Sequence, residues 1–359
     1  MIAHSPPVLW FLVGCGLVLV TQAGYLFSHN WDLTTLLQVG RESPARQPLE
    51  HELGPLTFVA GLGHDGKYFY LMARRPWVCQ ADPETLRGLE DPGYRYGRPL
   101  YPVLAGLGGL LPPQATLVGL ALVQVLSGGL LVVVLVLLAR HNGLPTLAVL
   151  IGLANPAIYS SAVLLTSDLL ASALVLAGIL FWQRGRVRAS LVFFALALLA
   201  KEYYALTPLI LAGSQFVQGR RWASLAVGVV PLLPLLGWKL IVLNAVGMGG
   251  GGGNFSWPGM GIWAAAPGWQ DCDPLAGLAV VLVILGLAAV ARASAPLPRW
   301  QCVTWGLLGV TASRIVWADP ADLLRVVSPL WWCVVWCWYP VAKRTSVANA
   351  PGSPALTTS

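Results

Sequence analysis

Three segments of this sequence carry ionisable side chains directly beside long apolar runs. The first reads GLGHDGKYFYLMARRP and places His64, Asp65 and Lys67 after a glycine-rich turn. A carboxylate at such a place is suited to general-base chemistry, because it can accept a proton from an attacking hydroxyl. The alternative is that Asp65 caps an interfacial helix whose aromatic side chains, Tyr68 among them, lie at the level of the lipid headgroups.

The second segment, LLTSDLLASA, places Asp168 at the start of an apolar run. Ser167 or Asp168 would make an ordinary N-cap there, and an acid in the first turn also suits the helix dipole. The opposing interpretation is a second site carboxylate, because an ionisable group near membrane depth is costly and usually functional. The sequence leaves both interpretations open.

The third segment, LAKEYY, places Lys201 and Glu202 in the middle of a stretch that begins and ends with basic clusters. The two charges can neutralise each other, or Lys201 can bind a lipid phosphate. Similar alternatives apply to Arg95, Arg98 and Arg325, which lie near the outer ends of apolar stretches. They can bind phosphate or snorkel to lipid headgroups.

The composition identifies lipid as the solvent of this chain. Of its 359 residues, 56% are hydrophobic and 10% are charged, whereas about a quarter of the residues are charged in soluble domains. The net charge of +7 arises from short basic clusters between apolar runs. This pattern is typical of cytoplasmic loops and argues against a nucleic-acid partner.

The apolar runs predict an all-α polytopic membrane protein with about ten transmembrane helices. The predicted spans lie near 8–27, 115–139, 145–163, 168–183, 189–201, 203–218, 222–245, 274–291, 300–317 and 323–340. The apolar stretch 99–111 is short for a crossing. We place it on the outer surface, because only then do all the basic clusters share one side, as the positive-inside rule requires.

This threading predicts an integral membrane domain over 1–344 with the N-terminus inside. Outer loop 1 covers about 28–114 and carries interfacial helices, outer loop 2 covers about 246–273, and 345–359 form a disordered cytoplasmic tail. Cys79 and Cys272 are the only cysteines in polar loops. Both lie on the outer, oxidising side of this topology, where they either form a bridge or remain two unpaired thiols.

The segments HDGKYFYLMA and DPGYRYGRPLYPVLA together resemble the GT-C superfamily of polyprenyl-phosphate-sugar-dependent membrane glycosyltransferases. In detail they are similar to a bacterial family linked to cell-surface glycopolymer formation, which carries a DGxxYY and YRxxRxLYP pattern. The resemblance is sharpest over 61–105, keeps its order through about residue 220, and is only topological beyond. Lys67 and Phe69 depart from the family pattern.

The resemblance implies a GT-C-like fold and transfer of a sugar from a polyprenyl-phosphate carrier to a glycan, lipid or protein acceptor. The reaction would take place at the outer face of the bacterial inner membrane. Asp65 would then be the first-loop general base or a metal ligand, and Asp168 a second acid at a comparable outer turn, with Mg²⁺ or Mn²⁺ as the candidate metal. The candidate substrate-binding residues are His64, Lys67, Tyr68, Arg95, Arg98, Lys201, Glu202 and Arg325.

Two other functions fit part of the pattern. A lipid or anionic-solute transporter or flippase also needs intramembrane charges and broken helices, but its charges usually lie near the midplane in repeated halves, and no halves match here. A non-catalytic envelope assembly protein would keep the fold without the base, and the presence of Asp65 argues against it. The sharpest expectation is that Asp65 lies in a cavity at the outer surface, within reach of Lys201, Arg98 or Asp168.

Overall fold

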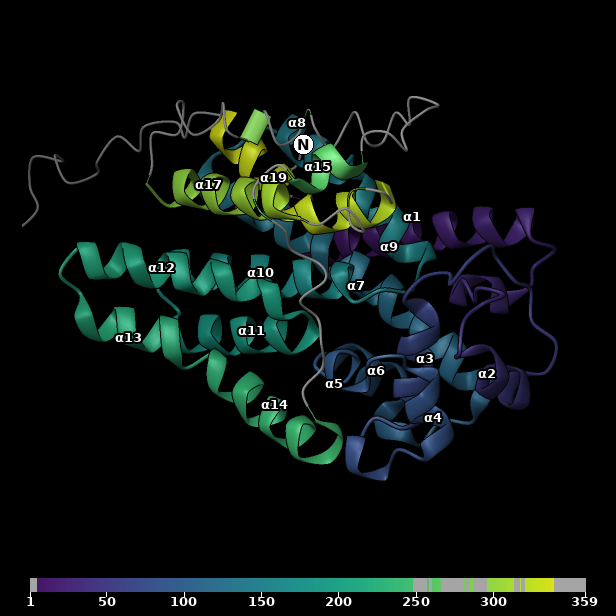
Figure 1. Ribbon diagram of the computed structural model, residues 1–359. Coiled ribbons are helices and arrows are strands. Elements are labelled where there is room, and N and C mark those ends of the chain that lie inside the picture. The colour runs from purple at the N-terminus through teal and green to yellow at the C-terminus, as the bar shows by residue number, and fades with distance from the viewer. Residues whose placement is uncertain are drawn as a thin grey trace, which may run out of the picture.

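The computed structural model describes residues 5–247, 257, 260–265, 281, 285–286, 296–312, 317 and 320–338, and its elements are shown in Figure 1. Regular secondary structure in these residues is entirely helical. The β-bridges that occur, Val39 with Gly63 and Gly40 with Val59, are isolated. The predicted all-α class is therefore confirmed for the described part of the chain. Most of the predicted span 274–291, most of outer loop 2, and the tail 345–359 lie outside it.

The chain begins with a long apolar helix, continues through a series of short helices, and then enters a second long helix. These elements are α1 (Pro7–Ser28), η2 (Leu33–Leu37), α2 (Arg46–Leu53), α3 (Gly66–Arg74), η3 (Val78–Gln80), α4 (Pro83–Gly88), α5 (Pro92–Arg95), α6 (Leu100–Ala105), η4 (Leu107–Gly109) and α7 (Pro113–Asn142). Since α6 has six residues and rises about 9 Å, the stretch 99–111 does not contain a helix long enough to cross a bilayer.

The remaining helices form the rest of the bundle. They are α8 (Thr146–Leu153), α9 (Pro156–Val163), α10 (Asp168–Gln183), α11 (Val187–Ala200), η5 (Glu202–Ala205), α12 (Leu206–Val217), α13 (Arg221–Val229), α14 (Leu232–Val246), α15 (Met260–Ala265), α17 (Pro296–Thr311) and α19 (Pro320–Trp338). The predicted pair of short helices around LAKEYY corresponds to α11 and α12, which η5 separates.

Several helices are long and apolar enough to cross a membrane. In the described residues these are α1, α7 and the segment Arg221–Val246, and the pair α8 and α9 makes a fourth if its 41° bend lies within one span. Helices α10 and α11 are apolar but shorter. A membrane protein is thus indicated, whereas the count of about ten spans is not confirmed and stays a prediction.

Close helix packing joins α1 to α7. A Cβ atom on Gly14 would lie 2.4 Å from the Gly128 carbonyl oxygen, and one on Gly129 would lie 2.7 Å from the Cys15 sulfur. Such small residues let two backbones approach closely, which is how helices associate in a lipid environment. Helix α7 begins with Pro113 at its first position and ends at Gly143, whose φ of 66° suits a glycine.

The bundle has two chemically different ends. Helices α7 and α10 run in the same direction. Gln124, in the first half of α7, donates a hydrogen bond to the Thr166 carbonyl (2.5 Å) just before α10, and Asn142 at the end of α7 donates one to the Gln183 side chain (3.1 Å) at the end of α10. Helix α11 returns, and its C-cap Lys201 meets Asp168 at the start of α10. The 16 residues of α10 therefore hold the basic turn 184–188 about 24 Å from Asp168.

Other basic segments lie at the same end as this turn. Arg140, near the end of α7, donates a hydrogen bond to the Ser5 carbonyl oxygen (2.6 Å), which places the described N-terminal residues there too. Helix α12 starts beside η5 and runs away from Lys201, so the turn before Arg221 also lies at the basic end, at the left of Figure 1. The acidic side chains described below lie at the opposite end.

Candidate functional site

Asp65 stands at the N-cap position of α3 but does not cap the helix. Its Oδ1 instead accepts a hydrogen bond from the Arg95 guanidinium (2.7 Å), and its Oδ2 lies 3.9 Å from Arg325 Nη2. The Asp65 side chain keeps 23% of its surface exposed. The helix-cap interpretation of Asp65 is therefore wrong, and the carboxylate is open on one side.

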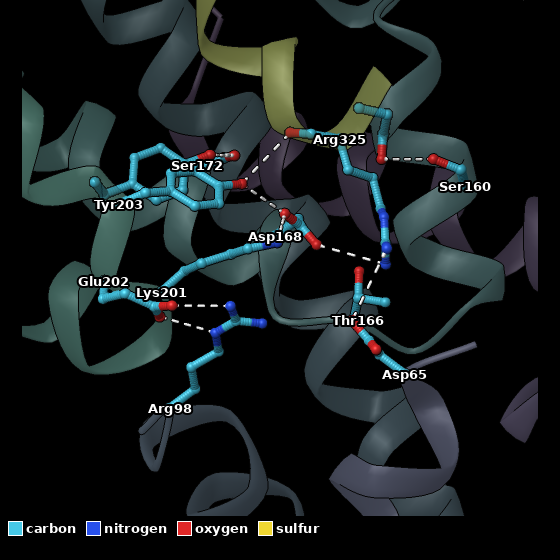
Figure 2. Close-up of polar contacts among 12 residues, drawn as sticks. Asp65, Arg98, Ser160, Thr166, Asp168, Ser172, Lys201, Glu202, Tyr203 and Arg325 are labelled. Atoms are coloured by element: carbon cyan, nitrogen blue, oxygen red, sulfur yellow. Dashed lines mark hydrogen bonds and ion pairs between the residues drawn. The ribbon is translucent and has the colours of Figure 1, made fainter. Parts of the chain in front are cut away.

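Asp168 begins α10 and likewise makes no cap, nor does Ser167 before it. Its Oδ1 receives hydrogen bonds from Lys201 Nζ and from the Tyr203 hydroxyl (2.9 Å), and its Oδ2 lies 3.8 Å from Arg325 Nη1. The Asp168 side chain is only 3% exposed. Figure 2 shows Arg325 reaching from α19 to both aspartates.

Lys201 and Glu202 do not neutralise each other. While Lys201 turns to Asp168, the two carboxylate oxygens of Glu202 receive hydrogen bonds from Arg98 Nε (2.8 Å) and Nη2 (2.9 Å). The Tyr94 hydroxyl accepts a further hydrogen bond from Arg98. Because Arg98 and Arg325 are buried within ion pairs, the alternative that they snorkel to lipid headgroups is wrong for both.

Two of the predicted substrate-binding residues, Lys67 and Tyr68, lie beside Arg95 and the turn before Asp65. The guanidinium carbon of Arg95 lies 3.9 Å from the centre of the Tyr68 ring, and Lys67 Nζ lies 4.1 Å from it. Buried Lys67 also donates a hydrogen bond to the His64 carbonyl oxygen (2.9 Å). These contacts give Lys67 and Tyr68 a part in positioning Arg95 and the turn before Asp65.

Glycine and a strained turn bring the two aspartates together. A Cβ atom on Gly66 would lie 2.8 Å from the Leu164 carbonyl oxygen, 3.1 Å from that of Leu36 and 3.2 Å from that of Leu37. The start of α3 can therefore approach the turn before Asp168 only with glycine at position 66. In that turn Leu165 has a φ of 47°, a conformation that is costly for leucine and that often occurs at functional sites.

Sequence analysis missed three side chains that belong to this cluster. Tyr203 binds Asp168, Tyr94 binds Arg98, and Lys239 of α14 lies against Gly97, close enough to act electrostatically on Glu202. The tyrosines stand within LAKEYY and DPGYRYGRP, where aromatic residues also suit a membrane interface. Lys239 offered one signal, a cation within an otherwise apolar predicted span.

The electrostatics of the site favour an anion. Burial raises the pKa of Asp65, but the charges of Arg95, Arg325, Arg98 and Lys201 outweigh burial and hold this pKa well below its ordinary value. Burial lowers the pKa of Arg95, and Asp65, Tyr68 and Tyr94 together more than restore it. The four cations and three carboxylates joined by ion pairs (Arg95, Arg98, Lys201 and Arg325 with Asp65, Asp168 and Glu202) carry one net positive charge, and Lys239 adds another beside Glu202.

The donor set does not fit the candidate Mg²⁺ or Mn²⁺ ion. Each of Asp65 and Asp168 already contacts two cationic side chains, and Arg325 takes the position between them that a bridging metal ion would need. Among the described residues, no group of three His, Cys, Asp or Glu side chains could hold a metal ion. We therefore derive no step through a metal.

The expectation that Asp65 lies within reach of Lys201, Arg98 or Asp168 is met only indirectly. Asp65 directly contacts Arg95 and Arg325, and it is linked to Asp168 through Arg325. A pocket between α7, α8 and α19 is apolar and lies away from these residues, lined by Leu135, Ala139, Leu144, Ala148, Val149, Gly152, Trp332 and Val335. Cys79 is a free, exposed thiol, and Cys272 lies outside the described residues, so the bridge between them stays a prediction.

Comparisons of the chain with protein-family models, with curated proteins and with solved structures gave no match. The class that the fold and the site define is therefore a helical protein with membrane-spanning features and a buried cationic cluster around three carboxylates.

Proposed function

We propose that this protein is a membrane glycosyltransferase that moves a sugar from a polyprenyl-phosphate carrier to an acceptor at the outer face of a bacterial inner membrane. The observation that carries the proposal is Asp65. It is an acid at a helix start that caps nothing, keeps one side exposed, and lies among cations that outnumber the carboxylates.

The reaction assigns a separate role to each charge type. An acceptor hydroxyl attacks the anomeric carbon and gives its proton to the Asp65 carboxylate, while the bond between that carbon and the phosphate oxygen breaks. The electron pair of the broken bond remains on the lipid phosphate. Arginine guanidinium groups bind phosphate oxygens in a matching planar geometry, so Arg95 and Arg325 suit the leaving group.

The two ends of the bundle support the orientation. Basic turns lie at one end, and the positive-inside rule assigns that end to the cytoplasm. The carboxylate cluster at the other end then faces the outer leaflet, where a lipid-linked donor can reach it. The acceptor is a glycan, a lipid or a protein with a free hydroxyl group.

The test is sugar transfer by Asp65→Asn protein, purified in detergent and supplied with polyprenyl-phosphate sugars and membrane-derived acceptors. The amide keeps the size of the side chain but cannot take the proton, so we expect transfer to fall by at least about 100-fold. Glu50→Gln is the matched control, since Glu50 forms an exposed pair with Arg46 outside this cluster. Normal transfer by folded Asp65→Asn protein would rule out this function.

A further inference from the structure

We infer that Arg95 and Arg325 hold Asp65 inactive as a base, and that binding of the anionic donor phosphodiester releases it by taking over a guanidinium group. This inference rests on the proposed function and adds a control step to it. Its consequence is that the base becomes effective only when the donor is in place.

The resting contacts supply the first argument. Arg95 binds one oxygen of Asp65 and Arg325 lies beside the other, so both edges of the carboxylate face a cation. A carboxylate held in this way is a weak base, because protonation would sacrifice two favourable charge interactions. Without a change in these contacts, Asp65 would accept a hydroxyl proton only slowly.

The two arginine contacts of Asp65 differ in distance and in hydrogen bonding, so a phosphate oxygen can replace one of them. Arg325 lies 3.9 Å from Asp65 and 3.8 Å from Asp168, beyond hydrogen-bond distance in both cases. Arg95 holds Asp65 at 2.7 Å, yet its Nε atom is buried without a hydrogen-bond partner in the described residues. A buried donor that lacks a partner is costly, and a phosphodiester oxygen would satisfy it.

The charges around Asp65 determine whether anion binding raises or lowers its proton affinity. Arg95 of α5 and Arg325 of α19 face it directly, Arg98 and Lys201 act from further away, and Tyr68, Tyr94 and Asp168 adjoin these cations. A bound phosphodiester adds a negative charge and takes up positive partners. Both effects raise the proton affinity of Asp65, as does exclusion of water by the ligand.

Thermodynamic linkage between anion binding and protonation of Asp65 makes the inference measurable. If anion binding raises the proton affinity of Asp65 by some factor, protonation of Asp65 must strengthen anion binding by the same factor. The probe is dihexyl phosphate, a phosphodiester that has no ionisation of its own near neutral pH. Calorimetric titration in buffers of different ionisation enthalpy reports both its affinity and the number of protons taken up on binding.

We expect proton uptake on binding to the wild-type protein that increases as the pH of the titration is lowered, because the bound anion weakens the cationic partners that keep Asp65 ionised. Asp65→Asn protein should bind dihexyl phosphate at least about tenfold more tightly, since one pKa unit corresponds to a tenfold change. It should take up no proton. Glu50→Gln protein is the matched control and should keep both the affinity and the uptake, because Glu50 pairs with Arg46 outside this cluster.

Unchanged affinity and unchanged uptake in Asp65→Asn protein would overturn the inference. So would uptake that persists in Asp65→Asn protein, which would place the titrating group elsewhere in the cluster. These results are separate from the transfer assay. Linkage without loss of transfer in Asp65→Asn protein would refute the glycosyltransferase function alone, whereas loss of transfer without linkage would refute only the control step.

Discussion

Asp65 and Asp168 begin as the same sequence signal and end in different surroundings. Each is an acid at the start of a helix, each leaves that helix without a side-chain cap, and each contacts Arg325. Yet the Asp65 side chain is 23% exposed and the Asp168 side chain is 3% exposed. Asp168 also binds Lys201, which is buried, and Tyr203, which is partly buried (Figure 2).

The difference in exposure and partners assigns different roles to the two carboxylates. An open carboxylate with exchangeable partners can meet a substrate hydroxyl, which suits Asp65 to the role of base. A closed carboxylate that binds Lys201, Tyr203 and Arg325 can only hold those groups in place, which makes Asp168 a positioning residue. The sequence-based assignment of Asp168 as catalytic is replaced by this role in the proposed mechanism.

The largest expected effect on stability comes from Asp168→Asn. The substitution leaves Lys201 buried without its carboxylate, and breaking a buried pair in this way costs about 3–5 kcal/mol. Thermal unfolding of the purified protein in detergent measures the loss. In the double variant with Lys201→Met the cost should shrink, because no buried charge is then left unpaired; losses that simply add would contradict the assigned pair.

The next effect is smaller and tests how the aspartates are brought together. Gly66→Ala places a Cβ against three backbone carbonyl groups, and such overpacking costs about 1–3 kcal/mol. It should also lower transfer by moving Asp65 away from Arg325. Gly16→Ala in α1 is the control, since nothing lies within 4 Å of the added Cβ. Equal losses from the two substitutions would show that the close approach at Gly66 is unimportant.

The sequence was sufficient for the class of fold and for the residues that form the ion pairs of the site, but not for Tyr94, Tyr203 and Lys239 beside them. Apolar runs predict helices reliably because lipid requires every backbone polar group to be satisfied within a segment. Asp168, Lys201, Glu202 and the three arginines were identified because charges beside apolar runs are costly. Asp65 was identified because it follows a glycine-rich turn and precedes an aromatic run in the first predicted outer loop. In the structure, five of these residues form one network of ion pairs: Asp65, Arg95, Arg325, Asp168 and Lys201. The other two, Arg98 and Glu202, form a separate pair close enough for Arg98 to act on Asp65.

The sequence could not show which of these cations pairs with which carboxylate. Lys201 and Glu202 are adjacent, yet the extended backbone at Lys201, with φ of −160° and ψ of 116°, lets their side chains reach different partners. Arg325 is separated from Asp65 by 260 positions in the chain, and no local pattern reports such a contact. The same limit explains why Lys239 and Tyr203 were missed.

A moderate effect is expected from Arg95→Gln. Burial raises the pKa of Asp65, and Arg95 is the strongest influence that lowers it, so removal of Arg95 moves this pKa upward. The carboxylate must be ionised to act, so the acid limb of kcat/KM should shift to higher pH by about one unit. A pH profile of transfer measures the shift. A limb that stays in place, with activity otherwise present, would argue that Arg95 does not control Asp65.

The same substitution has a consequence for stability, whose sign follows from the depressed pKa. Ionised Asp65 stabilises the folded protein above its unfolded-state pKa of about 3.9. In the wild-type protein that contribution is lost only as the pH falls through the lower folded value. In Arg95→Gln protein the contribution is smaller and disappears at a higher pH, which acid titration of unfolding will detect.

The smallest effect is expected from Glu50→Gln, and it provides the reference for the buried acids. The Arg46–Glu50 pair spans one helical turn of α2 with side chains 47% and 36% exposed, so water and salt screen it, and it contributes no more than about 0.5 kcal/mol. The substitution is the same change from acid to amide as in Asp168→Asn, and it leaves the contact of Arg46 with the Phe58 ring in place. Thermal unfolding at low and high salt should show nearly the same midpoint for Glu50→Gln and wild-type protein. If Glu50→Gln cost as much as Asp168→Asn, loss of any carboxylate would destabilise this protein, and burial would not be what distinguishes the acids of the cluster.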